Sequence, residues 1–424
     1  MRDDSNPDQA VGRPPHGGPP HGDPPHRGAE PHTRTGNRGC DRTGSRSPGR
    51  TLIVTNDYPP RRGGIETFVH EIAHRFPPGE VVVYTAAQPG SDAFDARQPF
   101  PVVRDRARTL LPSPRVAETA RALAFRYGCD RVWFGAAAPL GLLAGRLGLP
   151  CVATTHGHEM WWAALPGTRG VLRRIGRGVG TVTHLTAHSR ARTAGAFGPR
   201  AHTARLVPGV DTALFRPDSR ERARIRRELG LVGRPLILSV SRLVPRKGQD
   251  ALIRALPRVR SAVPGATLLI VGSGPYEGAL RRSVRRLPGL PEDAVVFTGP
   301  RAHSDLPPYY AAADVFAMPC RTRRLGLEAE GLGIVYLEAA AAGLPVLAGR
   351  SGGAPEAVKD GSTGHVVDGR DVQAVADGLT ALLTAPRAAA AMGAEGRAWV
   401  EAEWSWDASA RRLRSLLSRT VDTW

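Results

Sequence analysis

Two glutamates, Glu330 and Glu338, flank a glycine-rich apolar stretch that reads E-G-L-G-I-V-Y-L-E. An apolar segment and a basic loop come before it, so we expect a loop that runs into a helix, with Glu330 near the helix start. The first N–H groups of a helix lack partners and favour anions, phosphate above all. Glu330 could then bind sugar hydroxyls and Glu338 ribose hydroxyls, with Gly331 and Gly333 open to the ligand. An isolated pair with this spacing would indicate only two surface glutamates.

Three further polar residues follow predicted strands. Arg242 and Lys247 come after the strand at 236–240, and both could neutralise a diphosphate, Arg as a planar fork and Lys as a point charge. Solvated loop cations are the alternative. His156 ends the apolar strand at 151–155, where it could contact a hydroxyl or carbonyl group across a cleft. A core histidine hydrogen-bonded to backbone is the alternative there.

The residue patterns that other kinds of active site require are incomplete or missing in this sequence. The run His156-Gly157-His158-Glu159 suggests zinc, but no third ligand stands at a known spacing, so we expect no metal. Neither G-x-S-x-G nor a P-loop sequence occurs. Cationic diphosphate contacts and a carboxylate for sugar hydroxyls remain. They indicate a nucleotide-sugar site in which protein cations, in place of Mg²⁺, stabilise the leaving diphosphate.

Strands and helices alternate along the chain in two series, which predicts an α/β fold with two doubly wound, Rossmann-like domains facing a central cleft. Ligands of such sheets bind at the carboxyl ends of the strands, where the polar residues above lie. The predicted strands are 51–56, 81–85, 131–134, 151–155, 181–186 and 204–207, then 236–240, 267–271, 294–297, 315–319 and 344–348. The predicted helices include 65–76, 114–127, 139–147, 220–229, 249–259 and 305–313. The first glycine loop lacks G-x-G-x-x-G, so a dinucleotide site is not indicated.

The composition divides the chain and limits its partners. Residues 1–50 are rich in Pro, Gly, His and Arg, which predicts a disordered tail; domains at 51–208 and 209–403 follow, with a final helix at 404–424. Pro208-Gly209-Val210-Asp211 has the composition of a hinge. The net charge of +19 indicates an anionic partner: nucleic acid, an acidic membrane or a phosphorylated substrate. No nucleic-acid-binding module is recognisable, so we expect no nucleic-acid partner.

The cysteines, the apolar runs and the start of the chain indicate the cellular compartment. Four widely spaced cysteines form no metal or disulfide pattern, which fits a reducing cytosol. No run of roughly 18 apolar residues occurs, so no membrane-spanning helix is expected. The polar, proline-rich start of the chain does not have the pattern of a signal peptide.

From Thr51 onward the chain resembles the retaining glycosyltransferases of family 4, which have the GT-B fold. The resemblance rests on Gly63-Gly64-Ile65, Thr154-Thr155-His156-Gly157, Pro208-Gly209-Val210-Asp211, Ser241-Arg242-Leu243 through Lys247-Gly248, Gly272-Ser273-Gly274-Pro275 and the glutamate pair. The wording N-D-Y-P-P-R-R-G-G-I-E-T-F-V, R-L-V-P-R-K-G-Q-D, M-P-C-R-T-R and E-G-L-G-I-V-Y-L-E-A is similar to the actinobacterial phosphatidylinositol mannosyltransferases.

The resemblance implies an activity. Members of this family transfer mannose from GDP-mannose to a phosphatidylinositol mannoside at the inner membrane face, with retention of the anomeric configuration. This chain would then be a cytoplasmic enzyme, peripheral at the membrane, with a lipid-linked acceptor and no cofactor beyond the GDP-mannose co-substrate. Residues 51–208 would form the acceptor domain and 209–403 the donor domain, and the helix at 404–424 would cross back to the first domain.

It also implies residue roles. Arg242 and Lys247 would bind the donor diphosphate, Glu330 the donor sugar, Glu338 the ribose, and His156 the transferred sugar. The backbone of Gly331, Leu332 and Gly333 would lie near the phosphate, and Gly63 and Gly64 would let the first loop approach phosphate and acceptor.

Three alternatives remain open. One is a transferase of the same fold with another nucleotide sugar and a soluble or polysaccharide acceptor. The others are a GT-B sugar-nucleotide epimerase and a non-enzymatic nucleic-acid binder. The basic segment 321–329 departs from the family pattern and leaves the acceptor's identity open.

Overall fold

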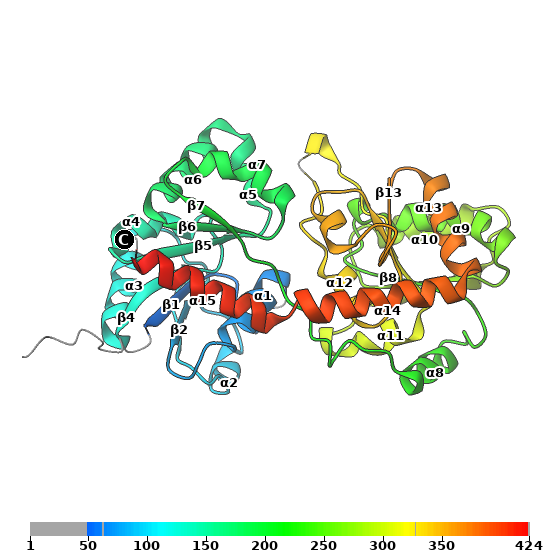
Figure 1. The fold of residues 1–424 in the computed structure, drawn as a ribbon, viewed down its shortest axis with the longest axis horizontal. Coiled ribbons are helices and arrows are strands. Elements are labelled where there is room, and N and C mark those ends of the chain that lie inside the picture. Colours follow the sequence, from blue (N-terminus) through cyan, green and yellow to red (C-terminus); the bar gives the residue numbers. More distant parts are fainter. Residues whose placement is uncertain (1–48, 62, 327, 423–424) are drawn as a thin grey trace, which may run out of the picture. The chain divides into compact units, whose positions relative to one another are not determined.

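The computed structural model describes residues 49–61, 63–326 and 328–422, which hold two parallel sheets (Figure 1). The seven-stranded sheet has the order β3-β2-β1-β4-β5-β6-β7, and the six-stranded sheet β10-β9-β8-β11-β12-β13. The strand pairs within both sheets are parallel. This topology confirms the predicted α/β fold of two Rossmann-like domains. The predicted tail, apart from Gly49 and Arg50, lies outside the described residues.

The first half of the described chain, residues 50–205, holds the seven-stranded sheet and its helices. The strands are β1 (Arg50–Thr55), β2 (Val81–Thr85), β3 (Val102–Arg104), β4 (Cys129–Phe134), β5 (Cys151–Thr155), β6 (Thr181–His184) and β7 (His202–Arg205). The helices are α1 (Gly64–Ala73), α2 (Ser91–Asp95), α3 (Pro114–Tyr127), η1 (Leu140–Leu143), α4 (Ala144–Leu147), α5 (Glu159–Ala164), α6 (Pro166–Gly178) and α7 (Ala187–Phe197).

The second half repeats the alternation. Its strands are β8 (Leu236–Val240), β9 (Thr267–Val271), β10 (Val295–Gly299), β11 (Val315–Met318), β12 (Val346–Gly349) and β13 (Gly364–Val367). Its helices are α8 (Ser219–Glu228), η2 (Pro245–Lys247), α9 (Gln249–Ala262), α10 (Glu277–Arg286), η3 (Glu292–Ala294), η4 (His303–Asp305), α11 (Pro307–Ala312), η5 (Arg324–Gly326), α12 (Ile334–Ala341), η6 (Ala354–Ala357), α13 (Val372–Thr384) and α14 (Pro386–Glu403). The last helix, α15 (Trp406–Asp422), follows the second half in sequence.

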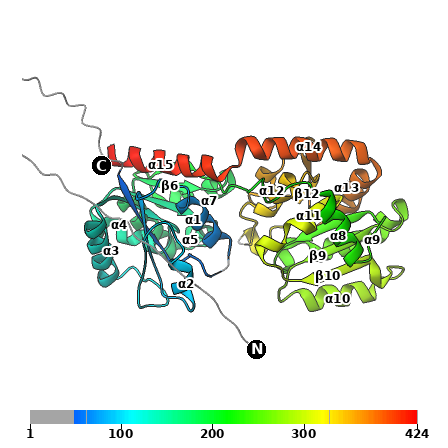
Figure 2. The ribbon, with the colours of Figure 1, turned by 90° about the horizontal axis from the view of Figure 1, so that it is seen from below.

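Apolar side chains cover both faces of each sheet, and the central strands are buried, whereas the edge strands β3, β7 and β10 are partly exposed. On one face of the first sheet, Leu52 and Val54 pack against α3, α4 and α6. On the other face, Ile53 packs with α1 and with Leu413 and Leu417 of α15. Figure 2 shows α15 on one side of this sheet and α3 and α4 on the other. The last helix therefore packs on the first sheet, although it follows the second in sequence.

Two chain crossings join the halves, and they lie against each other. The N–H group of Val210 donates to the carbonyl of Trp404 at 2.8 Å. A Cβ atom on Gly209 would lie 2.2 Å from the backbone nitrogen of Trp406, so only glycine fits between the crossings. The segment with the composition of a hinge thus lies in direct contact with the start of α15. No helix among the described residues is long and apolar enough to cross a membrane.

Replacing Gly209 with alanine should destabilise the protein, because the new methyl group must push the two crossings apart. We expect the free energy of unfolding to fall by about 1–3 kcal/mol, as overpacking usually costs. Urea unfolding measures it. Gly195→Ala is the matched control, because Gly195 lies in α7 and a Cβ atom there would meet no atom within 4 Å. Equal stability of the two variants would contradict the packing at Gly209.

Candidate active site

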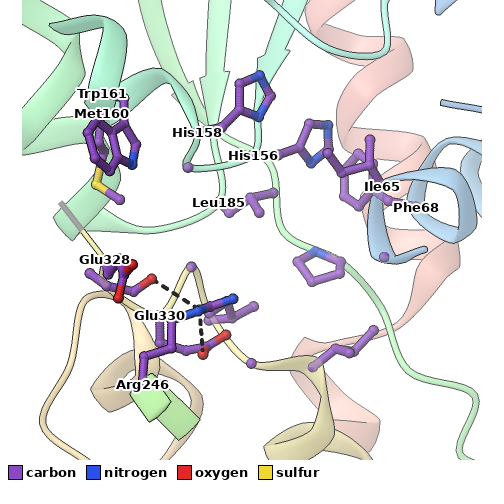
Figure 3. Close-up of a pocket in the computed structure, with 18 residues that line it drawn as sticks. Ile65, Phe68, His156, His158, Met160, Trp161, Leu185, Arg246, Glu328 and Glu330 are labelled. Atoms are coloured by element: carbon purple, nitrogen blue, oxygen red, sulfur yellow. Dashed lines mark hydrogen bonds and ion pairs between the residues drawn. The ribbon is translucent and has the colours of Figure 1, made fainter. Parts of the chain in front are cut away.

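One cavity, of about 470 Å³, is lined by both halves of the described chain. From the first half come the start of α1, the loop after β5 and Leu185 after β6; from the second come Arg246 and residues 328–334. Each of these segments follows a strand, so the cavity lies at the carboxyl ends of both sheets, where open parallel sheets bind ligands. Figure 3 shows His156 from one half facing Glu330 and Arg246 from the other.

Glu330 carries the buried charge of this cavity. Its side chain is only 8% exposed, and its Oε2 lies 2.8 Å from Nζ of Lys247 and 3.1 Å from a guanidinium nitrogen of Arg246. Burial acts to raise the pKa of Glu330, but the two cations outweigh burial and hold the pKa below its usual value. Glu330 is therefore ionised, and its two carboxylate oxygens have capacity for further hydrogen bonds from a ligand.

Arg246 was missed by sequence reasoning. It lines the cavity and also donates to the carbonyl of Ala329 at 3.3 Å (Figure 3). The only sequence signal was its place next to Lys247, which does not show which of two adjacent cations turns to the carboxylate. The short helix η2, Pro245–Lys247, turns both of them toward Glu330.

Arg242 lies elsewhere, in a neighbouring cavity of about 500 Å³ that belongs to the second half. The Gly272-Ser273-Gly274-Pro275 loop after β9 forms another wall of it, together with Arg301 and Leu306. Arg242 is exposed, and its guanidinium makes no ion pair or hydrogen bond with the described residues. The structure thus separates the two predicted cations: Lys247 is paired to Glu330, whereas Arg242 lies at the adjacent cavity with its charge open to a ligand.

Glu338 lies inside α12 and is 2% exposed. Its Oε1 lies 2.9 Å from Nε2 of His303, and its Oε2 accepts a hydrogen bond from Tyr310 at 2.7 Å. The hydrogen bond to this carboxylate raises the pKa of His303. Glu338 lines neither cavity, so the structure does not bring it together with Glu330 at the same wall. Neither partner of Glu338 was foreseen, since both come from the region 28 to 35 residues earlier.

His156 lines the cavity and also makes the backbone contact that sequence analysis gave as its alternative. Its Nε2 lies 2.7 Å from the carbonyl of Gly135, and Phe68 packs edge-on to the ring. A carbonyl can only accept, so Nε2 carries the proton and Nδ1 is an acceptor. Burial lowers the pKa of His156 to about 4. His156 is therefore a neutral hydrogen-bonding group at physiological pH and does not act there as a cation.

Glycines bring backbone to the cavity from both halves. Gly64, Gly331 and Gly333 line it, together with Leu332, whereas Gly63 stands just before α1 and is not a lining residue. Gly333 has φ 83° and precedes the first residue of α12, Ile334. The helix therefore begins later than predicted, and Glu330 lies in the loop before it. The N–H groups of Leu332 and Gly333 have no backbone or side-chain partner among the described residues, so they are available to an anion.

The His156-Gly157-His158-Glu159 run does not gather ligands. Glu159 is fully buried and accepts hydrogen bonds from the N–H groups of His156 and Gly157, which fixes the turn. Within the described part of the chain, no group of three or more His, Cys, Asp or Glu side chains could hold a metal ion. Metal independence remains a prediction.

Family models match most of the chain. Residues 221–399 match "Glycosyl transferases group 1", and residues 62–214 match "Glycosyltransferase Family 4". Two solved structures share the fold: HepE of Anabaena in complex with UDP (TM-score 0.74, 23% identity, 87% of this chain and 100% of that one) and sucrose-phosphate synthase of Thermosynechococcus elongatus (TM-score 0.73, 22%, 88% and 100%). The two-domain architecture is that of the GT-B glycosyltransferases.

Two curated relatives are far more similar. The GDP-mannose-dependent alpha-(1-6)-phosphatidylinositol monomannoside mannosyltransferase of Mycobacterium tuberculosis is 50% identical over 378 residues, 87% of this chain and 98% of the relative. The monoacylated phosphatidylinositol monomannoside mannosyltransferase of Corynebacterium glutamicum is 45% identical over 376 residues, 87% and 97%. The chain belongs to the same family of glycosyltransferases, which confirms the resemblance drawn from the sequence.

The ion pair between Lys247 and Glu330 should couple strongly in unfolding experiments. We expect Lys247→Met and Glu330→Gln each to destabilise the protein, and the double variant to lose about 1–3 kcal/mol less than their sum, because the pair is buried. Urea unfolding of the four proteins measures this coupling. The exposed pair Arg224–Glu228 on α8 is the matched control, with about 0.3–0.5 kcal/mol expected. A Lys247–Glu330 coupling no larger than the control's would contradict the buried pair.

Proposed function

We propose that this protein is a retaining mannosyltransferase that moves mannose from GDP-mannose to a phosphatidylinositol mannoside. The observation that carries the proposal is the identity of about half of all residues with transferases of that name, over nearly their whole length. The cavity adds physical support, because its buried carboxylate is paired with Arg246 and Lys247 and lies near free backbone N–H groups at the carboxyl ends of the strands.

The chemical problem of such a transfer is the negative charge that develops on the leaving GDP. The guanidinium of Arg242 has no partner among the described residues, and Lys247 retains donor capacity beyond its bond to Glu330. The N–H groups of Leu332 and Gly333 add the positive end of α12. We assign these four groups to the donor diphosphate, where preorganised donors stabilise the transition state more than the ground state.

In this proposal, the carboxylates of Glu330 and Glu338 accept hydrogen bonds from sugar hydroxyls. Glu330, fixed by Lys247 and Arg246, accepts from hydroxyls of the donor sugar through its remaining lone pairs. Glu338 holds the ribose, either beside His303 or in its place, because each carboxylate oxygen has capacity for more than one donor. His303 is half exposed and can move aside.

The first half supplies the acceptor side. Nδ1 of His156 accepts from a hydroxyl of the transferred mannose, while Nε2 stays on Gly135. Gly64 leaves room at the start of α1, because a Cβ atom there would meet no atom within 4 Å. In this proposal, Gly63 and Gly64 let the first loop approach phosphate and acceptor. The acceptor hydroxyl then attacks from the face that GDP leaves, which retains the anomeric configuration. No protein nucleophile is needed for that step.

We also propose that the lipid acceptor brings the enzyme to the inner membrane face. Residues 160–210 carry eight arginines and no aspartate or glutamate. Trp161, at the cavity, and Leu165 are exposed beside this basic region, by 39% and 53% of their surfaces. Cations near an anionic leaflet stabilise binding by about 1 kcal/mol each, and aromatic side chains suit the interface.

A donor and acceptor screen of the full-length protein tests the function. We expect GDP release from GDP-mannose that requires lipid extract from actinobacteria, with a mannosylated lipid as product, and an unchanged rate in the presence of EDTA. UDP-glucose and UDP-N-acetylglucosamine should release no UDP. UDP release, or release without lipid, would move the chain to another branch of the family. Loss of activity with EDTA would contradict the assignment of diphosphate stabilisation to protein cations.

A further inference from the structure

A carboxylate from the second half completes the cap of a helix in the first. Glu356 of η6 accepts hydrogen bonds from the N–H groups of Ala187, at 2.9 Å, and His188, at 3.1 Å. These are the first two residues of α7, whose next N–H group, that of Ser189, donates to the hydroxyl of Thr186 at 3.0 Å. The first N–H groups of a helix lack partners within the helix. In α7, Glu356 of the second half accepts from two of them, and Thr186 of the first half accepts from the third.

The same segment holds the backbone of Glu330. The N–H group of Glu356 donates to the carbonyl of Gly353 at 3.0 Å, and that of Gly353 to the carbonyl of Glu330 at 2.9 Å. The N–H group of Glu330 donates to the hydroxyl of Ser351 at 3.2 Å. A continuous hydrogen-bonded path therefore runs from the start of α7 through Glu356 to both backbone groups of Glu330.

The path is tightly packed at Gly353. A Cβ atom on Gly353 would lie 2.1 Å from the carbonyl oxygen of Gly331 and 2.4 Å from a methyl carbon of Thr186. Gly353 thus lies between the loop of the candidate active site and the other half of the molecule. Gly331 in turn lies against the first half, since a Cβ atom there would be 3.6 Å from the carbonyl oxygen of His156.

We propose that Glu356 is a positioning residue that ties the contact between the two halves to the position of Glu330. A carboxylate suits this role because it accepts from two adjacent N–H groups at once and carries the charge that a helix start favours. When the halves separate, Glu356 loses both hydrogen bonds, and the segment 351–356 loses its support on α7. Glu330 then takes its productive position only while the halves are in contact. The catalytic part of this inference rests on the proposed function; the contact itself does not.

The test compares Glu356→Ala with a matched loss of a helix cap. Asp371 caps α13 through two backbone N–H groups, at 2.9 and 3.1 Å, entirely within the second half. Asp371→Ala therefore removes the same kind of cap without touching the contact between the halves. Small-angle scattering of the full-length proteins without substrate should show a larger radius of gyration for Glu356→Ala than for Asp371→Ala and wild type.

The kinetic arm uses GDP-mannose and the lipid acceptor. We expect kcat of Glu356→Ala to fall about 10-fold or more, because small displacements of positioned groups cost that much. The dissociation constant of GDP, measured by calorimetry, should change less than about 3-fold, since Arg242, Lys247 and α12 all belong to the second half. Glu356→Gln, which keeps one acceptor oxygen, should be intermediate. The melting temperatures of Glu356→Ala and Asp371→Ala should be similar.

Two results would overturn the proposal. One is a kcat of Glu356→Ala equal to that of Asp371→Ala, with equal radii of gyration. The other is a parallel loss of kcat and GDP affinity, which would mean that Glu356 only supports the folding of the donor site. If the wild type transfers no mannose, the proposed function fails, but the scattering arm still decides whether Glu356 holds the halves together.

Discussion

The burial of one ionised carboxylate, Glu330, constrains the whole site. Burying a charge is costly unless it is paired and hydrogen-bonded, and Glu330 meets both conditions. Lys247 and Arg246 supply the opposite charge from η2, and Ser351 and Gly353 hold its backbone from the loop after β12. Three segments that follow three different strands must therefore meet at one point. The parallel topology of the second sheet brings them there, because the carboxyl ends of its strands share an edge.

The site also needs the first half, and the structure joins the halves at several places. Gly209 packs on Trp406 where the two crossings meet, and α15 packs on the first sheet. At the cavity, His156 and Gly157 lie against Gly331, and Glu356 caps α7. In the proposed reaction, a donor held by the second half would have groups of the first half at its sugar. This arrangement suits a reaction that must exclude water from an activated sugar while admitting an acceptor.

Those strands and helices that local residue patterns determine could be predicted from the sequence. Apolar runs ending in polar residues predicted β1, β5, β8 and β11, and with them the strand ends that carry His156, Lys247 and Glu330. It did not predict α5 or α6, since residues 159–178 contain Pro166 and four glycines, which lower helix propensity. The helix predicted at 139–147 is split into η1 and α4, and β13 was not predicted at all. These elements depend on packing against the sheets more than on their own sequence.

The roles of single side chains were harder to predict than their positions. Glu356 meets Ala187 across 169 residues, and Glu338 is paired with His303 and Tyr310 of another element. No spacing rule joins such residues, because the fold alone sets their distance. Arg246 and Lys247 show the same limit at short range: adjacent in sequence, both turn to one carboxylate only because of the short helix that carries them.

The most direct test of the proposed transfer site is the turnover of Arg242→Ala, Lys247→Ala and Glu330→Gln with GDP-mannose and lipid acceptor. Arg282→Ala, on the exposed face of α10, is the control. We predict that each of the three variants loses roughly 100-fold or more in kcat, as loss of a charge contact to a transition state usually causes, while the control keeps wild-type turnover. Folded variants with near-wild-type turnover at all three positions would contradict the assignment of these three residues to the site of transfer.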